Sequence, residues 1–336
     1  MAAPLAAASV ESAADVRRRN RPPLDQLLPA AARALERELG RLPDRLSVIA
    51  SSRRTWSSVW ELRSGPDQYI LKWLPLRAQR ELELTRAARD VFAGAPFVRS
   101  ARVACCPTPD TFLVEKLPGE HLQNLCSAPP WLTVSRWIDG RCDLLTRVGR
   151  WLAGFHGASL EAGSSPLAGV RAYVSAREGA FPSAHRPLYE ALWRAIDSGR
   201  ATATVRVHGD FTPHNVLATA DSISVIDLAG ISEFERETRW FDVACMVVGL
   251  EENWRRRRTN HLKYFGSYSR AMVSSFLEGY GARVDDPILP ICYAVRHFGR
   301  IATHFRRTGR QPGARDWHVG RLRLALQRPD QIWRGV

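Results

Sequence analysis

The stretch VRVHGDFTPHNVLA, Val205 to Ala218, carries two histidines, an aspartate and an asparagine between two apolar runs. A second stretch, ISVIDLAG, begins at Ile223 and places Asp227 directly after a β-branched run. Gly209 and Pro213 supply turn residues, so a polar turn between two strands is the simplest interpretation. The order of the acidic and amide side chains across the two stretches nevertheless indicates a chemical function.

The spacing of three polar residues predicts a phosphoryl-transfer site. Asp210 precedes Asn215 by five positions on the expected loop, and Asp227 ends the strand that follows. Phosphoryl transfer requires a carboxylate that accepts the hydroxyl proton, an amide oxygen on a metal ion and a carboxylate that bridges metal and phosphates. The five-residue spacing matches the kinase pattern of a catalytic-loop aspartate followed by an asparagine.

The choice of lysine at position 72 points to the same chemistry. Only three of the 48 basic residues are lysines, and Lys72 ends the strand-like run QYILKWLP. An ammonium group is a compact point charge that an arginine does not replace at a tight phosphate site. An acidic helix follows, and either Glu81 or Glu83 could pair with this lysine. We favour Glu81, because it puts Leu84 and Ala88 on the following inward turns.

The order of the predicted elements indicates an α+β chain with two lobes. Residues 1–24 are Ala-rich and short of large apolar side chains, so we expect a disordered leader. The amphipathic helix LDQLLPAAARALEREL precedes three β-rich runs, LSVIASS, SSVWELRS and QYILKWLP, and two more strands are expected at Phe97–Ala104 and Phe112–Lys116. From Leu144 the chain is mostly helical, apart from two short strands between Val205 and Ile226. This order predicts a small β-rich, nucleotide-binding N-lobe over residues 25–116 and a larger helical C-lobe over residues 117–336.

The composition limits the class of protein. Apolar residues make up 45% of the chain and charged residues 24%, which is typical of a soluble globular protein. No apolar run reaches membrane-spanning length, and the six cysteines show no metal-binding or paired spacing, so we expect a cytoplasmic protein with no membrane partner. A net charge of +14 could attract nucleic acid. However, no aromatic RNA-binding motif, zinc finger or heptad repeat accompanies this charge. Nucleic-acid binding is therefore not expected.

The chain resembles the aminoglycoside phosphotransferase and choline kinase family, which has a protein-kinase-like fold. VHGDFTPHNVL and VIDLAG carry most of the resemblance, and LVEKLPGEHL, VGRWLAGFH, WFDVACMV and FLEGYG support it. The resemblance implies that Asp210 is the catalytic base and that Asn215 and Asp227 are magnesium ligands. It also implies that Lys72 binds the phosphates of ATP, and that the C-terminal helices bind the acceptor.

Further roles follow from the same resemblance. Residues from Glu115 to Leu117 would form the adenine-facing hinge between the lobes. His208 would brace the catalytic loop, and Asp242 and His156 would have structural roles. Backbone amides of Ser57 and Ser58 could hold phosphates, although their loop, SSRRTWSSVW, contains no glycine.

We therefore expect an ATP- and Mg²⁺-dependent phosphotransferase that acts on a hydroxyl group of a small molecule. After Asp227 the sequence lacks a second acidic residue, so the metal would depend on Asn215, Asp227 and phosphate oxygens. A nucleotide-binding scaffold without catalysis remains an alternative because of the glycine-free loop. A protein kinase is a second alternative, although the glycine of HGD and the missing APE-like segment argue against it.

The sequence leaves the acceptor and the oligomeric state open. Basic side chains recur every three or four residues along one face of an expected C-terminal helix, at Arg296, Arg300, His304 and Arg307. A solvated charged face is the simpler interpretation, and an anion-binding wall of the acceptor site is the other. A sugar, an antibiotic hydroxyl, an amino alcohol and an anionic metabolite all remain candidate acceptors.

Overall fold

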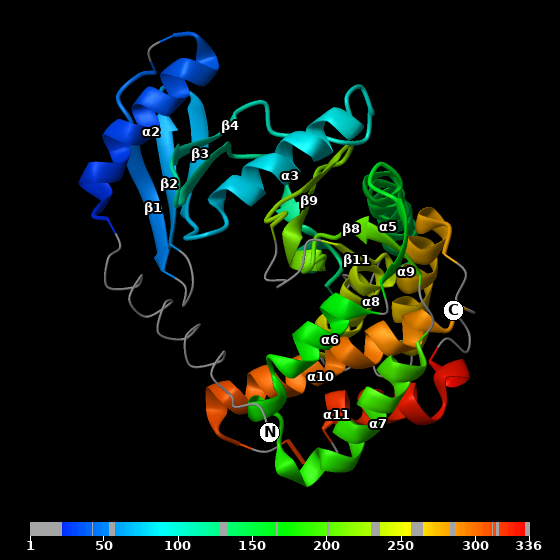
Figure 1. Ribbon diagram of the computed structural model, residues 1–336. Helices are drawn as coiled ribbons and strands as arrows, with labels where there is room; N and C mark the ends of the chain where they lie inside the picture. The colour runs from blue at the N-terminus through cyan, green and yellow to red at the C-terminus, as the bar shows by residue number, and fades with distance from the viewer. Residues whose placement is uncertain are drawn as a thin grey trace. The chain divides into compact units, whose positions relative to one another are not determined.

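A five-stranded antiparallel sheet in the order β1-β2-β3-β5-β4 is the centre of the N-terminal unit (Figure 1). The strands are β1 (Ser47–Arg53), β2 (Ser58–Ser64), β3 (Asp67–Trp73), β4 (Ala104–Thr108) and β5 (Thr111–Glu115). Buried residues alternate with more exposed ones along β2, as expected for side chains that point to opposite faces of a sheet.

The computed structural model describes residues 22–41, 43–53, 58–127, 134–165, 167–199, 202–229, 236–256, 265–282, 286–310, 312–313 and 316–332. The chain divides into two units. The first unit contains residues up to Ala93 and Arg99–Leu117, and the second contains Gly94–Val98 and the chain from Pro118 onward.

Two helices cover opposite faces of the five-stranded sheet. The predicted amphipathic helix is α2 (Leu24–Leu39), which ends at Gly40 in the left-handed conformation with φ of 64°. Its apolar face packs with side chains such as Trp60 and Leu113. Helix α3 (Ala78–Val91) packs on the other face, where Leu82 meets Phe112. Neighbouring residues of β5 therefore face different helices, and the sheet is buried on both sides.

One predicted strand is misplaced. The expected strand Phe97–Ala104 is absent from the sheet, and Val98 forms only an isolated bridge with Ile223. The observed β4 begins at Ala104 and continues through Pro107 with an irregular register. Proline removes a backbone donor, so sequence reasoning ends a strand before it, but β4 lies at the edge of the sheet, where a missing donor is tolerated.

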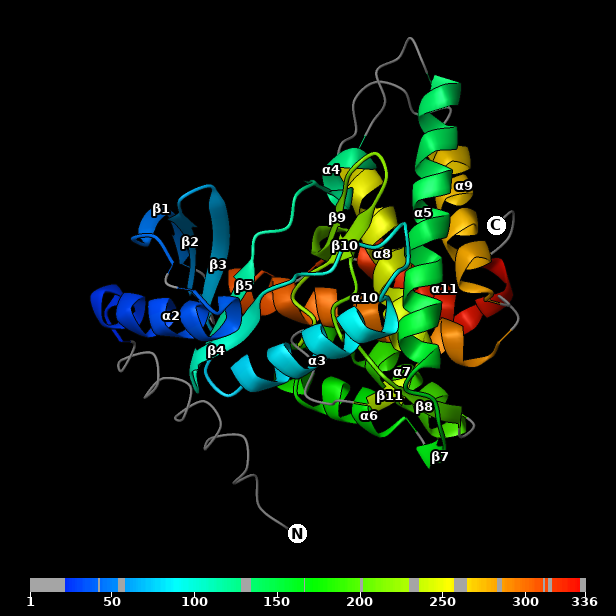
Figure 2. The same cartoon turned by 90° about the horizontal axis from the view of Figure 1, so that it is seen from above.

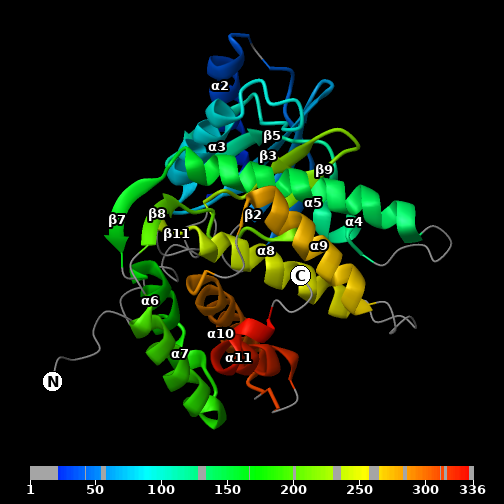
Figure 3. The same cartoon turned by 90° about the vertical axis from the view of Figure 1, so that its right-hand side faces the viewer.

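Helices form most of the second unit. Its α-helices are α4 (Leu122–Leu125), α5 (Val134–Gly157), α6 (Ala168–Ser175), α7 (Arg186–Ser198), α8 (Trp240–Arg256), α9 (Phe265–Tyr280), α10 (Ile288–Thr308) and α11 (Trp317–Gln327). Helices α5 and α9 lie side by side (Figure 2). Their backbones approach closely, and glycines at Gly149 and Gly279 allow this. A Cβ on Gly149 would lie 2.3 Å from the carbonyl oxygen of Phe276, and one on Gly279 would lie 2.2 Å from that of Thr146. Helix α10 packs against α8 and α11 (Figure 3).

Two small sheets connect these helices. One has the order β10-β9-β6 and the other β11-β8-β7, and all neighbouring strands are antiparallel. The strands are β6 (Glu120–His121), β7 (Glu161–Ser165), β8 (Thr202–Arg206), β9 (Val216–Ala218), β10 (Ile223–Val225) and β11 (Arg236–Thr238). The α+β class is confirmed, with a small β-rich lobe and a larger, mainly helical one. No helix in the described ranges is both long enough and apolar enough to cross a bilayer.

Candidate active site

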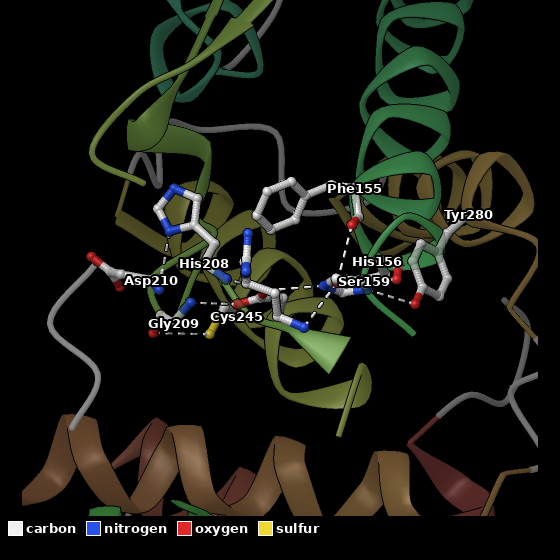
Figure 4. A network of polar contacts seen from close by, with 10 residues as sticks. Phe155, His156, Ser159, His208, Gly209, Asp210, Cys245 and Tyr280 are labelled. Atoms are coloured by element: carbon white, nitrogen blue, oxygen red, sulfur yellow. Dashed lines mark hydrogen bonds and ion pairs between the residues drawn. The ribbon is translucent and has the colours of Figure 1, made fainter. Parts of the chain in front are cut away.

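A loop between β8 and β9 carries the motif residues, and a buried carboxylate holds its backbone. Asp242, in the first turn of α8, accepts hydrogen bonds from the backbone N–H groups of His208 at 2.7 Å and Gly209 at 2.8 Å. Gly209 has φ of 81°, a conformation that favours glycine over other residues. The thiol of Cys245 lies 3.9 Å from the carbonyl oxygen of Gly209 (Figure 4). The turn before Asp210 is therefore fixed from inside the unit.

Two further residues hold the Asp242 carboxylate in place. Nε2 of His156, near the end of α5, lies 3.2 Å from Oδ2 of Asp242, and Nδ1 of the same ring lies 2.8 Å from the Tyr280 hydroxyl. Burial alone would raise the pKa of Asp242, but the hydrogen bonds from His156 and the His208 backbone lower it below its usual value. Asp242 is therefore an ionised, buried clamp, in agreement with the structural role expected for it and for His156.

His208 links the loop to the strand that ends at Asp227. Its Nε2 lies 3.0 Å from the carbonyl oxygen of Ile226, and its Nδ1 lies 3.3 Å from the backbone nitrogen of Asp210. Since a carbonyl oxygen can only accept, Nε2 carries the proton and Nδ1 accepts from Asp210. Both contacts fit the bracing role predicted for His208.

Apolar packing fixes the remainder of the loop. Phe211 is fully buried, and its ring stacks on Trp151 of α5 at a centroid distance of 5.7 Å. Pro213 packs so closely against Gly249 of α8 that a Cβ there would lie 2.5 Å from the proline ring. Because α5 and α8 both contact the loop, its side chains are held by the helical core of the unit.

The three motif residues come together at this loop. The amide nitrogen of Asn215 donates to the backbone oxygen of Asp210 at 2.8 Å and lies 3.4 Å from its Oδ2. The backbone N–H of Ile226 donates to the carbonyl oxygen of Asn215 at 3.0 Å, which brings the adjacent Asp227 to the same place. Asp227 has φ of 57°, a left-handed conformation that aspartate and asparagine tolerate better than most residues. Figure 4 shows the Asp210 carboxylate pointing away from the His156–Tyr280 network.

Arg296 of α10 also lies at this site; the sequence analysis placed it on a basic helix face but did not predict its contact with Asp210. Its Nη2 lies 3.1 Å from Oδ1 of Asp210, and only 4% of its side chain is exposed. The solvated-face interpretation is therefore wrong at this position. The carboxylate of Asp210 compensates the charge that is buried there. Arg300 pairs instead with Glu252 of α8 at 3.0 Å, while His304 and Arg307 are exposed.

Helix α10 is enclosed on every side at the level of Arg296, because Val295, His297 and Phe298 are all fully buried. The sequence carries a signal for this burial. The apolar run ICYAV before Arg296 already departs from a half-exposed helix.

In the first unit, Lys72 pairs with the favoured glutamate. Nζ of Lys72 lies 3.7 Å from Oε1 of Glu81, and both side chains are buried. Glu83 is exposed and accepts a hydrogen bond from Gln79. Ser58 is buried at the start of β2, and the next residue, Val59, pairs with Lys72 in the sheet. Ser57 lies outside the described residues.

In the expected hinge, one backbone N–H has no acceptor among the described residues. The backbone N–H groups of Glu115 and Lys116 donate to Val103 and Gln68. The Glu115 carboxylate binds the guanidinium and the backbone N–H of Arg102. Burial alone would raise the pKa of Glu115, but these hydrogen bonds lower it. Within the described ranges the N–H of Leu117 has no acceptor.

The oxygen atoms of Asn215 and Asp227 fit a hard divalent cation. No group of three or more His, Cys, Asp or Glu side chains in the described part of the chain could hold a metal. Asn215 already uses its amide nitrogen on Asp210, so the amide oxygen is the end left for a metal. One amide oxygen and the Asp227 carboxylate suit Mg²⁺, which takes few protein ligands and completes its shell with water and phosphate oxygens.

Comparisons with solved structures confirm the protein-kinase-like fold. A glucosamine kinase in complex with glucosamine, ADP and inorganic phosphate superposes with a TM-score of 0.58 at 16% identity, covering 89% of this chain and 85% of that one. A thermostable mutant of an aminoglycoside phosphotransferase with ADP and hygromycin B gives a TM-score of 0.51 at 14% identity, covering 89% and 98%. An ADP-bound aminoglycoside phosphotransferase of another type gives a TM-score of 0.52 at 13% identity, covering 88% and 95%. These identities are low enough that the likeness concerns the fold alone.

Sequence comparison identifies the family. No curated protein sequence matches the chain significantly. The profile of the phosphotransferase enzyme family matches residues 49–273, which is about two thirds of the chain and includes both the Lys72 strand and the loop that carries Asp210 and Asn215. This chain therefore belongs to the phosphotransferase enzyme family.

Proposed function

We propose that this protein is an ATP- and Mg²⁺-dependent kinase that phosphorylates a hydroxyl group of a small molecule. The observation that carries the proposal is the arrangement of Asp210, Asn215 and Asp227 on one loop and its neighbouring strand, fixed by the buried Asp242 clamp. A carboxylate base, an amide oxygen and a second carboxylate are the groups that phosphoryl transfer requires.

In the proposed reaction Asp210 acts as the general base. It accepts the proton of the acceptor hydroxyl while the hydroxyl oxygen bonds to the γ-phosphorus, and the bond from that phosphorus to ADP breaks. Mg²⁺, held by Asn215 and Asp227, would neutralise charge on the phosphate oxygens. The protein otherwise contributes position, because its loop is held by His208 and Asp242 before any substrate binds.

The first unit would supply the nucleotide contacts. Lys72, fixed by Glu81, would bind the α- and β-phosphates as a compact positive charge. The N–H of Leu117 would donate to the base, and the hinge segment from Glu115 would flank it. Ser57 and Ser58 remain the candidates for backbone contacts with the phosphates.

The charges of the second unit favour an acceptor that is not a polycation. Two glutamates in the C-terminal part of α8 are paired internally: Glu251 with Arg321 at 2.5 Å, and Glu252 with Arg300 at 3.0 Å. Carboxylates that are already paired offer little attraction to several ammonium groups.

Free thiols at all six cysteines support a reducing, cytoplasmic setting for this reaction.

Acceptor-dependent ADP release tests the proposal. The purified protein is mixed with Mg·ATP and a panel that includes neutral sugars, glucosamine, amino alcohols, hygromycin B and phosphorylated metabolites. We expect stimulation of ADP release by at least one neutral or singly charged compound and none in the Asp210→Asn variant. Tight binding of Mg·ATP without turnover on any compound would favour the scaffold alternative, and phosphate incorporation into added protein would favour a protein kinase.

A further inference from the structure

The ion pair between Arg296 and Asp210 joins α10 to the catalytic loop. Nη2 of Arg296 lies 3.1 Å from Oδ1 of Asp210 across 86 positions of sequence. The guanidinium also lies over the ring of Phe241, 5.7 Å from the centroid. One turn of helix later, Gly299 leaves room for the Tyr173 hydroxyl, which a Cβ at Gly299 would approach to 2.1 Å. The arginine is therefore enclosed by packed side chains with its charged end at the loop.

Burial of this arginine needs an explanation, because a buried charge is costly unless it is paired. An arginine remains charged under all ordinary conditions. Within the described residues its Nε has no hydrogen-bond partner, and Asp210 is its one acidic partner. Asp210 itself is 26% exposed, so the pair places a buried cation behind a carboxylate that reaches solvent.

The two oxygens of Asp210 are held differently. Oδ1 accepts the charge-assisted bond from Arg296, whereas Oδ2 lies 3.4 Å from the amide nitrogen of Asn215, beyond a good hydrogen-bond distance. The guanidinium thus fixes the rotation of the carboxylate and occupies one oxygen. Oδ2 keeps lone pairs that can accept a proton.

We propose that Arg296 is a positioning residue for the base: it holds Oδ1 of Asp210 so that Oδ2 is presented to the acceptor hydroxyl. This inference rests on the proposed function, in which Asp210 receives the proton. Arg296 transfers no group itself. Arg296 sets the orientation of the Asp210 carboxylate before the acceptor binds. It also compensates the negative charge of that carboxylate within the protein. The acceptor therefore needs no ammonium group beside the reacting hydroxyl.

A kinetic double-mutant cycle tests this role with water as the acceptor, so the natural acceptor need not be known. Arg296→Met and Arg296→Lys are made in the parent and in Asp210→Asn, with Arg306→Met, an exposed site on the same helix, as the charge-matched control. ADP release from Mg·ATP gives kcat and the KM for ATP. We expect Arg296→Met to lower kcat at least tenfold with an unchanged KM, Arg296→Lys to retain part of the activity, and Arg306→Met to equal the parent. In Asp210→Asn, Arg296→Met should change kcat by less than twofold.

Two kinetic outcomes would overturn the inference. One is a folded Arg296→Met variant with parental kcat. The other is an equal loss of kcat in both backgrounds, because a purely structural arginine would act independently of Asp210. If Arg296→Met alone does not fold, the comparison is made with Arg296→Lys in both backgrounds.

Denaturant unfolding of the same variants provides a readout that does not depend on activity. We expect the double variant Asp210→Asn/Arg296→Met to be more stable than the sum of the two single losses predicts, because neither partner is left unpaired. Additive losses would overturn the ion pair and the inference with it. Absence of ADP release in the parent with water and with every compound of the acceptor panel, combined with clear coupling in unfolding, would contradict the proposed function and leave the ion pair standing.

Discussion

The carboxylate of Asp242 accepts the backbone N–H of Gly209 at 2.8 Å, although 33 positions separate the two residues. Its other oxygen accepts the N–H of His208 and faces the His156 ring. The residue that follows Gly209 is the proposed base. The direction of the Asp210 backbone is therefore set by a carboxylate at the start of α8, and its side chain is set by an arginine of α10.

Replacing this buried carboxylate should destabilise the protein. Asp242→Asn keeps the shape but loses the charge, and its amide nitrogen would face N–H donors that need an acceptor. We expect a loss in the free energy of unfolding of about 3 kcal/mol or more, as for other broken buried ionic contacts. Urea unfolding measures the loss. Asp221→Asn, at an exposed position between β9 and β10, is the control and should be unchanged.

Stability at acid pH should depend on the same carboxylate. The pKa of Asp242 in the folded protein lies below its usual value, so its contribution to stability is complete above the pKa of an unfolded aspartate. The contribution is lost as pH falls through the lower folded value, that is, below about pH 4. Unfolding free energy measured between pH 7 and pH 3 should therefore fall more steeply in the parent than in Asp242→Asn. Parallel curves would contradict the assignment of Asp242 as an ionised clamp.

Loss of the base should separate turnover from nucleotide binding. Asp210→Asn should lower kcat by about 10²- to 10⁴-fold, the usual contribution of a general base, while affinity for Mg·ATP changes little. The variant also leaves Arg296 buried without an anion, so we expect a lower melting temperature as well. Kinetics, calorimetry and thermal unfolding measure the three quantities. Retention of most of the turnover would exclude Asp210 as the base.

The sequence predicted the parts of the site that depend on local spacing. Asp210 and Asn215 share one loop, and Asp227 follows the next strand, so their proximity follows from a short hairpin. The preference for Glu81 over Glu83 followed from helical periodicity, and the structure places Glu81 beside Lys72. These inferences needed only the geometry of one strand or one helix.

The sequence did not predict features that depend on distant partners. The partner of Arg296 lies 86 positions away, and helical periodicity assigned the arginine to the same face as the exposed His304 and Arg307. Helix α10 is enclosed at its centre and exposed at its end, so one face changes its environment along its length. A strand before the loop was expected and corresponds to β8, but its partners β7 and β11 were missed, because they are short and distant from it in sequence.

The glutamate beside Lys72 should govern nucleotide use. Glu81→Gln removes the charge that holds the ammonium group, so the lysine should lose its fixed position toward the phosphates. We expect kcat/KM for ATP to fall about tenfold or more, equivalent to about 1.4 kcal/mol of transition-state stabilisation. Glu83→Gln, two positions away and exposed, is the matched control and should behave as the parent. Equal effects of the two substitutions would contradict a specific role for the Lys72–Glu81 pair.

The last prediction concerns the metal. Asp227 occupies a left-handed conformation with φ of 57°, so alanine at this position would combine backbone strain with loss of the ligand. Asparagine tolerates the same conformation and isolates the effect of the negative charge. We expect Asp227→Asn to retain the parental melting temperature and to lose most of the Mg²⁺-dependent gain in ATP affinity, because the carboxylate bridges metal and phosphates. Calorimetric titration with ATP, with and without Mg²⁺, measures that gain in both proteins. Equal gains in the parent and the variant would remove Asp227 from the metal site and leave Asn215 without its proposed partner.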